Sequence, residues 1–435
     1  MPEALHDSAP NVKPQERHNA ICNVTGEVIW GFQGSLVPVA TVLTVLLLQL
    51  GARQSTVGLL PMLDGMMLMM QLAGIYLFRD RRTRRVKIVV WHYVTMLPFL
   101  GLIGVLILLR HHISPAALVV MVMACWSVFV LAMGVVIAAW QDWLAHLFHE
   151  GIRGRVTGLA WGLSSLVGVV GALIAGWILK LYPDLSTFGW LYLVAMVLAV
   201  VSITVFLSIR DPAEQEEQEA VARLRDMGAA ARQSLRTADF RAVLIGRSLA
   251  YAGFCVGPYI TMYYLSDAGG KLSDSLLVSL GAAQTLGAAV ACIVFGRLGD
   301  RIGHRVGVLT GALFQIACLL CVLLVAGPIG CLLAMLCAGG VRGAMSVSYM
   351  NLVLESCPHR IRSAHVAIGN IIVGMTAMVA PILGSRLAGG YGIRTMMGAS
   401  LAVSIVAAAW IAWKVRDPRH TRGVAVREPV DAHAA

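Results

Sequence analysis

The sequence of 435 residues is 58% hydrophobic and only 13% charged, and its mean hydropathy is +0.76. Soluble domains carry about 25% charged residues, so this composition excludes an ordinary soluble globular protein. The net charge of +11 fits either a nucleic-acid partner or a membrane surface, and the positions of the cations decide between the two.

Apolar runs of membrane-spanning length recur along the whole chain. Each is long enough to cross ~30 Å of hydrocarbon as an α-helix, which satisfies its own backbone hydrogen bonds. A transmembrane β-barrel would instead show alternating segments of about ten residues, and these are absent. We therefore expect twelve helical spans, at 19–50, 54–78, 87–109, 115–145, 156–180, 187–208, 241–266, 273–296, 306–326, 328–353, 365–388 and 395–415.

The loops between these spans differ in their content of Lys and Arg. If the N-terminus is cytoplasmic, the inner loops other than 209–240 and its border with span 7 hold twenty cations and the outer loops hold six. Cytoplasmic loops carry the excess of Lys and Arg. We expect both termini in the cytoplasm and the chain in the plasma (inner) membrane, which explains the basic charge without nucleic acid.

The chain divides into two similar halves. An offset of 220 residues aligns Gly26 with Gly246, Pro38 with Pro258 and Thr41 with Thr261. Two six-helix repeats with a substrate site between them are a transporter architecture. The predicted organisation is a cytoplasmic tail at 1–16, a six-helix bundle at 17–208, a cytoplasmic linker at 209–240, a second bundle at 241–415 and a cytoplasmic tail at 416–435.

The turn between spans 8 and 9 reads G-R-L-G-D-R-I-G-H-R from Gly296 to Arg305. This segment closely resembles the G-x-x-x-D-R-x-G-R-R signature of the major facilitator superfamily. With the repeat and the hydropathy, the resemblance covers residues from about 17 to 415. It implies an all-α polytopic fold of two pseudo-repeated six-helix bundles, alternating access for a small-molecule substrate, and a functional monomer.

The same resemblance assigns a gating role to the motif. Its glycines permit close helix approach, and its charged groups can form a latch that holds one state of the cytoplasmic gate. A weaker copy with Asp80, Arg81 and Arg85 lies between spans 2 and 3, and Glu355 is an expected partner of the second copy. The alternative is a set of ordinary inner-loop cations. The predicted gate residues of the second copy are Gly296, Gly299, Asp300, Arg301, Gly303 and Arg305.

Four charged residues fall inside predicted spans, where charge is costly and therefore a sign of function. Glu27 and Asp64 are the candidates for proton coupling, because a carboxyl in an apolar span can bind and release a proton. Arg342 and Arg247 are candidates for substrate contact, and permanent internal pairing with the acids is the alternative. The resemblance places spans 1, 4, 7 and 10 around the cavity, which adds Trp30, Gln33, Tyr251 and Trp126 as lining candidates. Ordinary helix packing is the alternative for each of them.

No enzyme motif competes with this interpretation. The sequence has no H-E-x-x-H and no G-x-S-x-G, and the C-x-x-C of Cys318 and Cys321 is expected to pack within an apolar span. We expect no catalytic residues, no metal and no cofactor. The sequence predicts a secondary transporter, proton-coupled, with efflux and uptake both open. A non-transporting receptor that keeps this fold, or a membrane-embedded enzyme, is the alternative.

Overall fold

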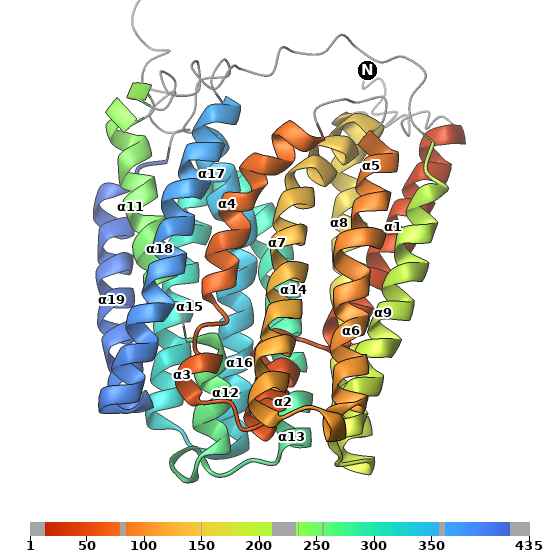
Figure 1. Cartoon of the computed structure of the whole chain (residues 1–435). Helices are drawn as coiled ribbons and strands as arrows, with labels where there is room; N and C mark the ends of the chain where they lie inside the picture. Colours follow the sequence, from red (N-terminus) through yellow and green to blue (C-terminus); the bar gives the residue numbers. More distant parts are fainter. Residues whose placement is uncertain are drawn as a thin grey trace, which may run out of the picture.

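The computed structural model describes residues 14–78, 84–148, 150–210, 232–233, 235–254, 256–355 and 362–417. Within these ranges the chain is helical and has no strand. Twelve segments are long and apolar enough to span a membrane, which confirms the predicted all-α fold of twelve spans. They stand side by side in one bundle (Figure 1).

The first six spans form the first half of the bundle. Hydroxyl and carboxylate caps begin two of these helices, since Ser114 accepts a hydrogen bond from Ala117 N (3.4 Å) and Asp184 accepts one from Ser186 N (2.9 Å). The elements are α1 (Pro14–Leu36), η1 (Val39–Leu43), α2 (Thr44–Gln49), α3 (Gln54–Val57), α4 (Met62–Leu77), α5 (Arg84–Trp91), η2 (His92–Met96), α6 (Leu97–Leu108), η3 (Arg110–His112), α7 (Pro115–Leu147), α8 (Glu150–Leu181) and α9 (Leu185–Leu207).

The last six spans form the second half. Its elements are α11 (Ala238–Gly253), α12 (Gly257–Leu265), η4 (Asp267–Gly269), α13 (Asp274–Leu280), α14 (Ala282–Ile302), α15 (His304–Leu324), α16 (Gly327–Ala344), η5 (Met345–Tyr349), α17 (Met350–Glu355), α18 (Arg362–Tyr391) and α19 (Ile393–Lys414). Because the number of spans is even, α1 begins and α19 ends at the same face, here called the terminal face. The opposite face, called the distal face, carries α2, α3, α12 and α13 (Figure 1).

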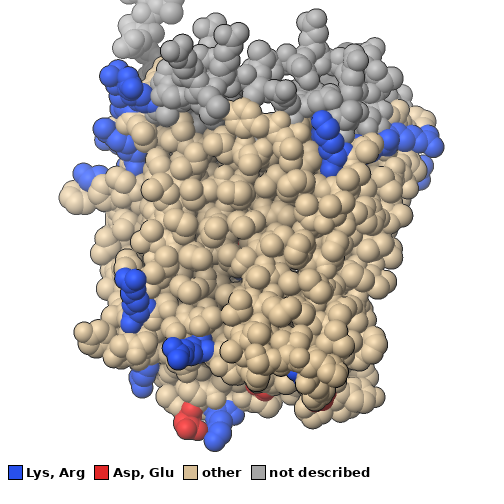
Figure 2. Space-filling model, viewed as in Figure 1, with Lys and Arg blue, Asp and Glu red and all other residues tan. Residues whose placement is uncertain are grey.

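The outside of the bundle is apolar between its two ends. Figure 2 shows Lys and Arg gathered toward the upper and lower ends of one face, with a band of other residues between them. Large apolar side chains such as Leu166, Val197 and Leu383 are exposed around the bundle. A surface of this kind needs a hydrocarbon environment, so the chain is an integral, multi-pass membrane protein.

The first span of each half is interrupted at the same position of the repeat. α1 ends at Leu36, and Pro38 adopts extended backbone (φ −67°, ψ 139°) before the π-helix η1 begins. α11 ends at Gly253, and α12 restarts at Gly257 with Pro258 in its first turn. Proline has no N–H and clashes with the preceding helical turn. The repeated prolines therefore explain why both spans break where the two halves meet.

The two halves touch along two seams. Along the α4–α18 seam, a Cβ added at Gly65 would lie 2.5 Å from Gly374 O, so the two backbones are in direct contact. Along the α8–α14 seam, Gly168 faces the Thr285 methyl group, with 3.2 Å between that carbon and a Cβ added at Gly168. Nearer the distal face Gly176 lies against Ser279 of α13. Both seams therefore depend on residues without side chains.

The distal face is also closed by hydrogen bonds between the halves. Thr261 Oγ1 donates to Ala40 O at 2.5 Å, and Gln49 Nε2 donates to Asp274 Oδ2 at 2.5 Å. Thr261 is the repeat partner of Thr41, so it binds the carbonyl of the residue that precedes its own equivalent in the first half. The distal ends of η1, α12 and α13 form a closed layer.

Candidate functional site

A cavity of about 520 Å³ lies between the two halves, on the terminal-face side of the distal hydrogen bonds. Its walls come from α1, η1, α4, α7 and α8 of the first half and from α12, α14 and α16 of the second. Both proline-interrupted segments reach it, at Pro38 and at Pro258. The volume lies within the range of small-molecule sites.

Two opposite charges face each other within this cavity. Asp64 comes from α4 of the first half and Arg342 from α16 of the second, and both side chains are exposed to the cavity. Arg342 is near enough for its charge to act on the Asp64 carboxyl. Yet among the described residues no ion pair or side-chain hydrogen bond engages either group. The cavity therefore presents a separated carboxylate and guanidinium, one from each half.

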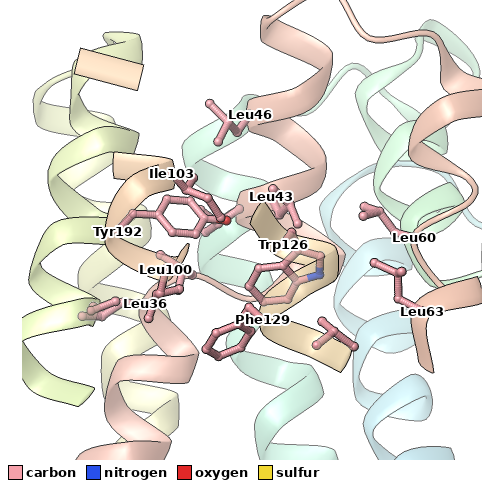
Figure 3. Packing of buried hydrophobic residues seen from close by; sticks show 14 of the residues in the cluster. Leu36, Leu43, Leu46, Leu60, Leu63, Leu100, Ile103, Trp126, Phe129 and Tyr192 are labelled. Carbon is pink, nitrogen blue, oxygen red and sulfur yellow. The ribbon is translucent and has the colours of Figure 1, made fainter. Parts of the chain in front are cut away.

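The remaining lining combines hydroxyl, amide and aromatic groups. Ser164, Ser165 and Gln284 supply neutral polar atoms. Trp126 and Phe129 of α7 stack with ring centroids 5.2 Å apart and an interplanar angle of 28°. Figure 3 shows these two rings beside leucine side chains that close the first-half wall. The site can bind a molecule with polar and apolar parts.

A smaller pocket of about 160 Å³ adjoins the cavity inside the first half. It shares Trp126 and Phe129 with the main cavity and adds Trp30, Gln33 and Leu100. Gln33 is buried, and the described part of the chain offers its amide no hydrogen-bond partner. The lining candidates Trp30 and Gln33 therefore lie in this side pocket, whereas Trp126 borders both spaces.

Glu27 lies outside both pockets. Trp140 Nε1 of α7 donates a hydrogen bond to Glu27 Oε1 at 3.1 Å. The Trp140 ring packs against Trp143 and Phe206, with centroids 5.2 and 4.3 Å away. The described residues place no cation beside this carboxyl. The structure thus separates the two acidic candidates, with Asp64 in the cavity facing an arginine and Glu27 in an aromatic setting.

Arg247 and Tyr251 also lie outside both pockets. The Arg247 guanidinium sits 5.8 Å from the Tyr251 ring centroid, and its Nη1 donates to Asn370 Oδ1 at 3.1 Å. Asn370 Nδ2 in turn donates to Gln71 Oε1 at 3.0 Å. This polar chain crosses from the second half to the first beside the α4–α18 seam. The sequence interpretation did not include Gln71 or Asn370, although both are polar residues inside apolar spans.

The comparison with protein families decides what this bundle is. The family model of the major facilitator superfamily matches residues 25–358 and, in a second match, 243–433. The chain belongs to the major facilitator superfamily. It is therefore a transporter by family, and a small-molecule substrate in a membrane setting follows from that membership. No curated protein matches the sequence.

Solved structures of the superfamily share the fold at low sequence identity. A point mutant of the nucleoside transporter NupG superposes with a TM-score of 0.67 at 11% identity, covering 92% of this chain and 99% of that one. A bacterial homolog of the human lysosomal transporter Spinster, in an inward-facing and occupied conformation, gives 0.64 at 13% identity, covering 93% and 98%. Its unoccupied form gives 0.58 over the same shares. At these identities the likeness concerns the fold alone.

The superfamily motif forms the turn between α14 and α15. Gly303 has φ +95°, a conformation that favours glycine, and a Cβ there would collide with the Asp417 carboxylate. Asp417 Oδ2 accepts a hydrogen bond from Arg305 N (3.4 Å), and Arg305 Nη2 donates to Ala412 O at the end of α19. Arg301 is exposed. These contacts hold the motif to its own half.

The glycines of the motif have different surroundings. A Cβ at Gly299 would lie 2.3 Å from His304 Nδ1, so this glycine permits the tight turn. A Cβ at Gly296 would meet no atom of the described residues within 4 Å. The gate candidates Asp300 and Glu355 belong to α14 and α17, but their side chains lie outside the described structure.

The first-half copy of the motif is described only in part. Asp80 and Arg81 lie outside the described residues. Arg85 Nη1 donates to Ile209 O, just beyond the end of α9. Arg85 and Arg305 are repeat partners, and each binds a carbonyl at the end of the sixth span of its own half. Cations are favourable at helix C-termini, so this pair of contacts stabilises each half separately.

No group of three or more His, Cys, Asp or Glu side chains within the described ranges has a geometry suited to a metal ion.

Proposed function

We propose that this chain is a proton-coupled secondary transporter that carries a small organic molecule through the central cavity by alternating access. The observation that carries the proposal is the cavity itself, which is built from both halves and holds a charged group from each. Substrate held between two repeats is the arrangement from which rocking of the halves alternates access.

The packing around the cavity differs between the two faces of the bundle, and this difference supports an assignment of the face toward which the cavity opens. Hydrogen bonds close the distal ends, whereas a Cβ added at Gly158 or Gly296, nearer the terminal face, would meet no described atom of another element within 4 Å. We propose that the cavity opens toward the terminal face in this state. With the Lys and Arg distribution of the loops, the terminal face is assigned to the cytoplasm, and the state is inward-facing.

Proton coupling is assigned to the carboxyls inside the spans, and first to Glu27. An ionised carboxyl within an apolar helix costs at least ~2.5 kcal/mol, and proton binding removes that charge. Asp64 faces Arg342, whose charge offsets part of the cost, whereas the described partner of Glu27 is the neutral Trp140. Glu27 is therefore the better placed proton carrier, and Asp64 is the second candidate.

The test uses proteoliposomes that contain a pH-sensitive dye, to which a library of polar metabolites is added one compound at a time. We expect transport of some compounds to be accompanied by proton movement, and these compounds to accumulate when a pH gradient is imposed. Glu27→Gln should abolish gradient-driven accumulation but keep substrate exchange at equal concentrations, since exchange needs no net proton movement. Asp267→Asn, an exposed loop acid, is the matched control.

Two results would contradict this assignment. If no compound accumulates or moves protons, the chain is not a transporter of this class. If Glu27→Gln and Asp64→Asn both keep full gradient-driven accumulation, then neither carboxyl carries the coupled proton. Membrane abundance of each variant is measured in parallel, because a structural role would lower the amount of folded protein instead.

A further inference from the structure

We propose that the transported molecule is dipolar, with a cationic group bound by Asp64 and an anionic group bound by Arg342. This inference rests on the proposed function and narrows it to a substrate class. The carboxylate and the guanidinium face the same cavity from opposite halves, and no described side chain pairs with either of them.

The charge balance of the cavity selects for such a ligand. Charged groups inside a membrane protein are costly unless paired or hydrated. A ligand with one positive charge would neutralise Asp64 but leave Arg342 unpaired and shielded from water. A ligand with one negative charge would neutralise Arg342 but leave Asp64 unpaired. A neutral ligand would displace water from both. A molecule with one charge of each sign pairs with both groups at once.

The separation of the two groups also fits a dipolar ligand better than a permanent internal salt bridge. Asp64 and Arg342 lie on α4 and α16, in different halves, and no ion pair joins them in this conformation. Both groups line one cavity of about 520 Å³, a volume that can hold a small ligand in contact with its walls. A ligand bound to both groups would contact both halves at once, so its affinity would depend on how the halves are arranged, and it could shift the balance between conformations.

The side pocket predicts a third feature of the ligand, in addition to its two charges. It shares Trp126 with the cavity that holds the charged groups, and it is lined mainly by Trp30, Phe129 and Leu100, with one buried amide from Gln33. Aromatic and aliphatic walls bind apolar groups, and a single amide in such a pocket fixes orientation. We therefore expect a dipolar molecule that carries an apolar or aromatic substituent, of the size of an amino acid.

The experiment measures ligand binding to the purified full-length protein by thermal stabilisation. The probes are the aliphatic and aromatic α-amino acids and the unbranched ω-amino acids from four to eight carbons, which vary the distance between the charges. Each is tested as the free amino acid, as its methyl ester, which keeps only the cation, and as its N-acetyl derivative, which keeps only the anion. At least one free amino acid should bind at least about tenfold more tightly than both derivatives.

Two variants give a readout that does not depend on the amount of folded protein. In Asp64→Asn the cationic group of the free amino acid loses its partner. The N-acetyl derivative and the free amino acid should therefore bind this variant with affinities within about twofold of each other. In Arg342→Gln the methyl ester should lose its disadvantage in the same way. Asp267→Asn and Arg386→Gln remove exposed charges away from the cavity and should keep the wild-type ratios.

The inference is overturned if no dipolar probe binds, or if the singly charged derivatives bind wild-type protein as tightly as their parents. It is also overturned if the affinity ratios of the two variants stay at wild-type values. Should either variant fail to fold, the wild-type panel still decides. Proton-coupled accumulation of singly charged or neutral compounds would retain the proposed function while rejecting this substrate class.

Discussion

The two seams between the halves differ along their length. The α4–α18 seam is in contact from the distal side, where Ser385 Oγ donates to Ser55 O (2.8 Å), through Gly65 and Gly374 to the Gln71–Asn370 hydrogen bond. The α8–α14 seam is in contact at Gly176 and Gly168 and, among the residues that the structure describes, open at Gly158 and Gly296. In this state one seam is therefore closed along its described length, and the other is closed toward the distal face and open toward the terminal face. We expect the first to act as the hinge and the second as the gate of the proposed transport cycle.

Helical geometry shows that the open part of the α8–α14 seam lies on the same helix faces as the part that is in contact. Gly158 and Gly176 are 18 residues apart, which is five turns, so they share one face of α8. Gly296 is 11 residues from Thr285, close to three turns, and shares its face of α14. The two open glycines therefore lie on the faces that touch nearer the distal side. They are placed for a close backbone approach when the seam closes.

The largest effect is expected from filling the hinge seam. Gly65→Leu places a side chain against Gly374 O and the backbone of Ala377 and Met378, which cannot move aside as a flexible side chain could. Overpacking of this kind costs at least about 1–3 kcal/mol. The melting temperature in detergent and the amount in the membrane should both fall. Gly398→Leu, at a helical glycine with open space around it, should leave both unchanged.

Filling the open part of the gate seam should separate stability from transport. The Cβ of Gly296→Leu would meet no described atom within 4 Å in this state, and the change replaces a poor helix former, so the melting temperature should be kept or slightly raised. The same side chain would prevent α14 from closing on α8. Accumulation in proteoliposomes should fall at least about tenfold. Full transport by Gly296→Leu would mean that this part of the seam never closes.

The polar chain beside the hinge offers a smaller effect. Asn370→Ala removes the acceptor of Arg247 and the donor to Gln71. These side chains are partly buried, so the loss should fall at the lower end of the about 1–3 kcal/mol that an unpaired buried polar group costs. Gln71→Ala and Asn370→Ala should be non-additive in a double-mutant cycle of melting temperature. Thr376→Ala, which loses only a bond to its own helix, is the control. Additive losses would show that the seam is not coupled at this position.

The smallest effect is expected at the distal layer. Gln49→Ala removes the hydrogen bond to Asp274, which is exposed and worth less than about 1 kcal/mol. Reaction of Ser35→Cys in the cavity with an impermeant thiol reagent, added on the distal side, should become faster by less than about fivefold. An unchanged rate would assign the distal closure to packing at Thr41 and Gly281 instead.

The sequence predicted the class of this fold because its signals are local. Membrane spans are read from runs of apolar residues, and the repeat was visible in Pro38 and Pro258. The breaks in the first spans were not predicted, since the hydropathy continues through them, although the same two prolines mark the positions. A proline in a span is a local signal that could have located both breaks.

The arrangement of the site was less predictable, because it depends on contacts between distant segments. Asp64 and Arg342 were singled out as charges inside spans, but only the fold brings them to one cavity. Arg247 aligns with Glu27 in the repeat, yet it binds Asn370 instead of facing the cavity. Gln71 and Asn370 are 299 residues apart, and helix periodicity carries no information on such a pair.

The most direct test is disulfide cross-linking of the gate seam in membranes, comparing Gly158→Cys/Gly296→Cys with Gly176→Cys/Ser279→Cys under the same mild oxidant. The distal pair, which is in contact in this state, should cross-link rapidly. We expect the open pair also to cross-link with time, because the proposed alternating access brings α8 and α14 together there in the opposite state. Complete cross-linking of the distal pair with none at Gly158 and Gly296 would contradict alternating closure of this seam.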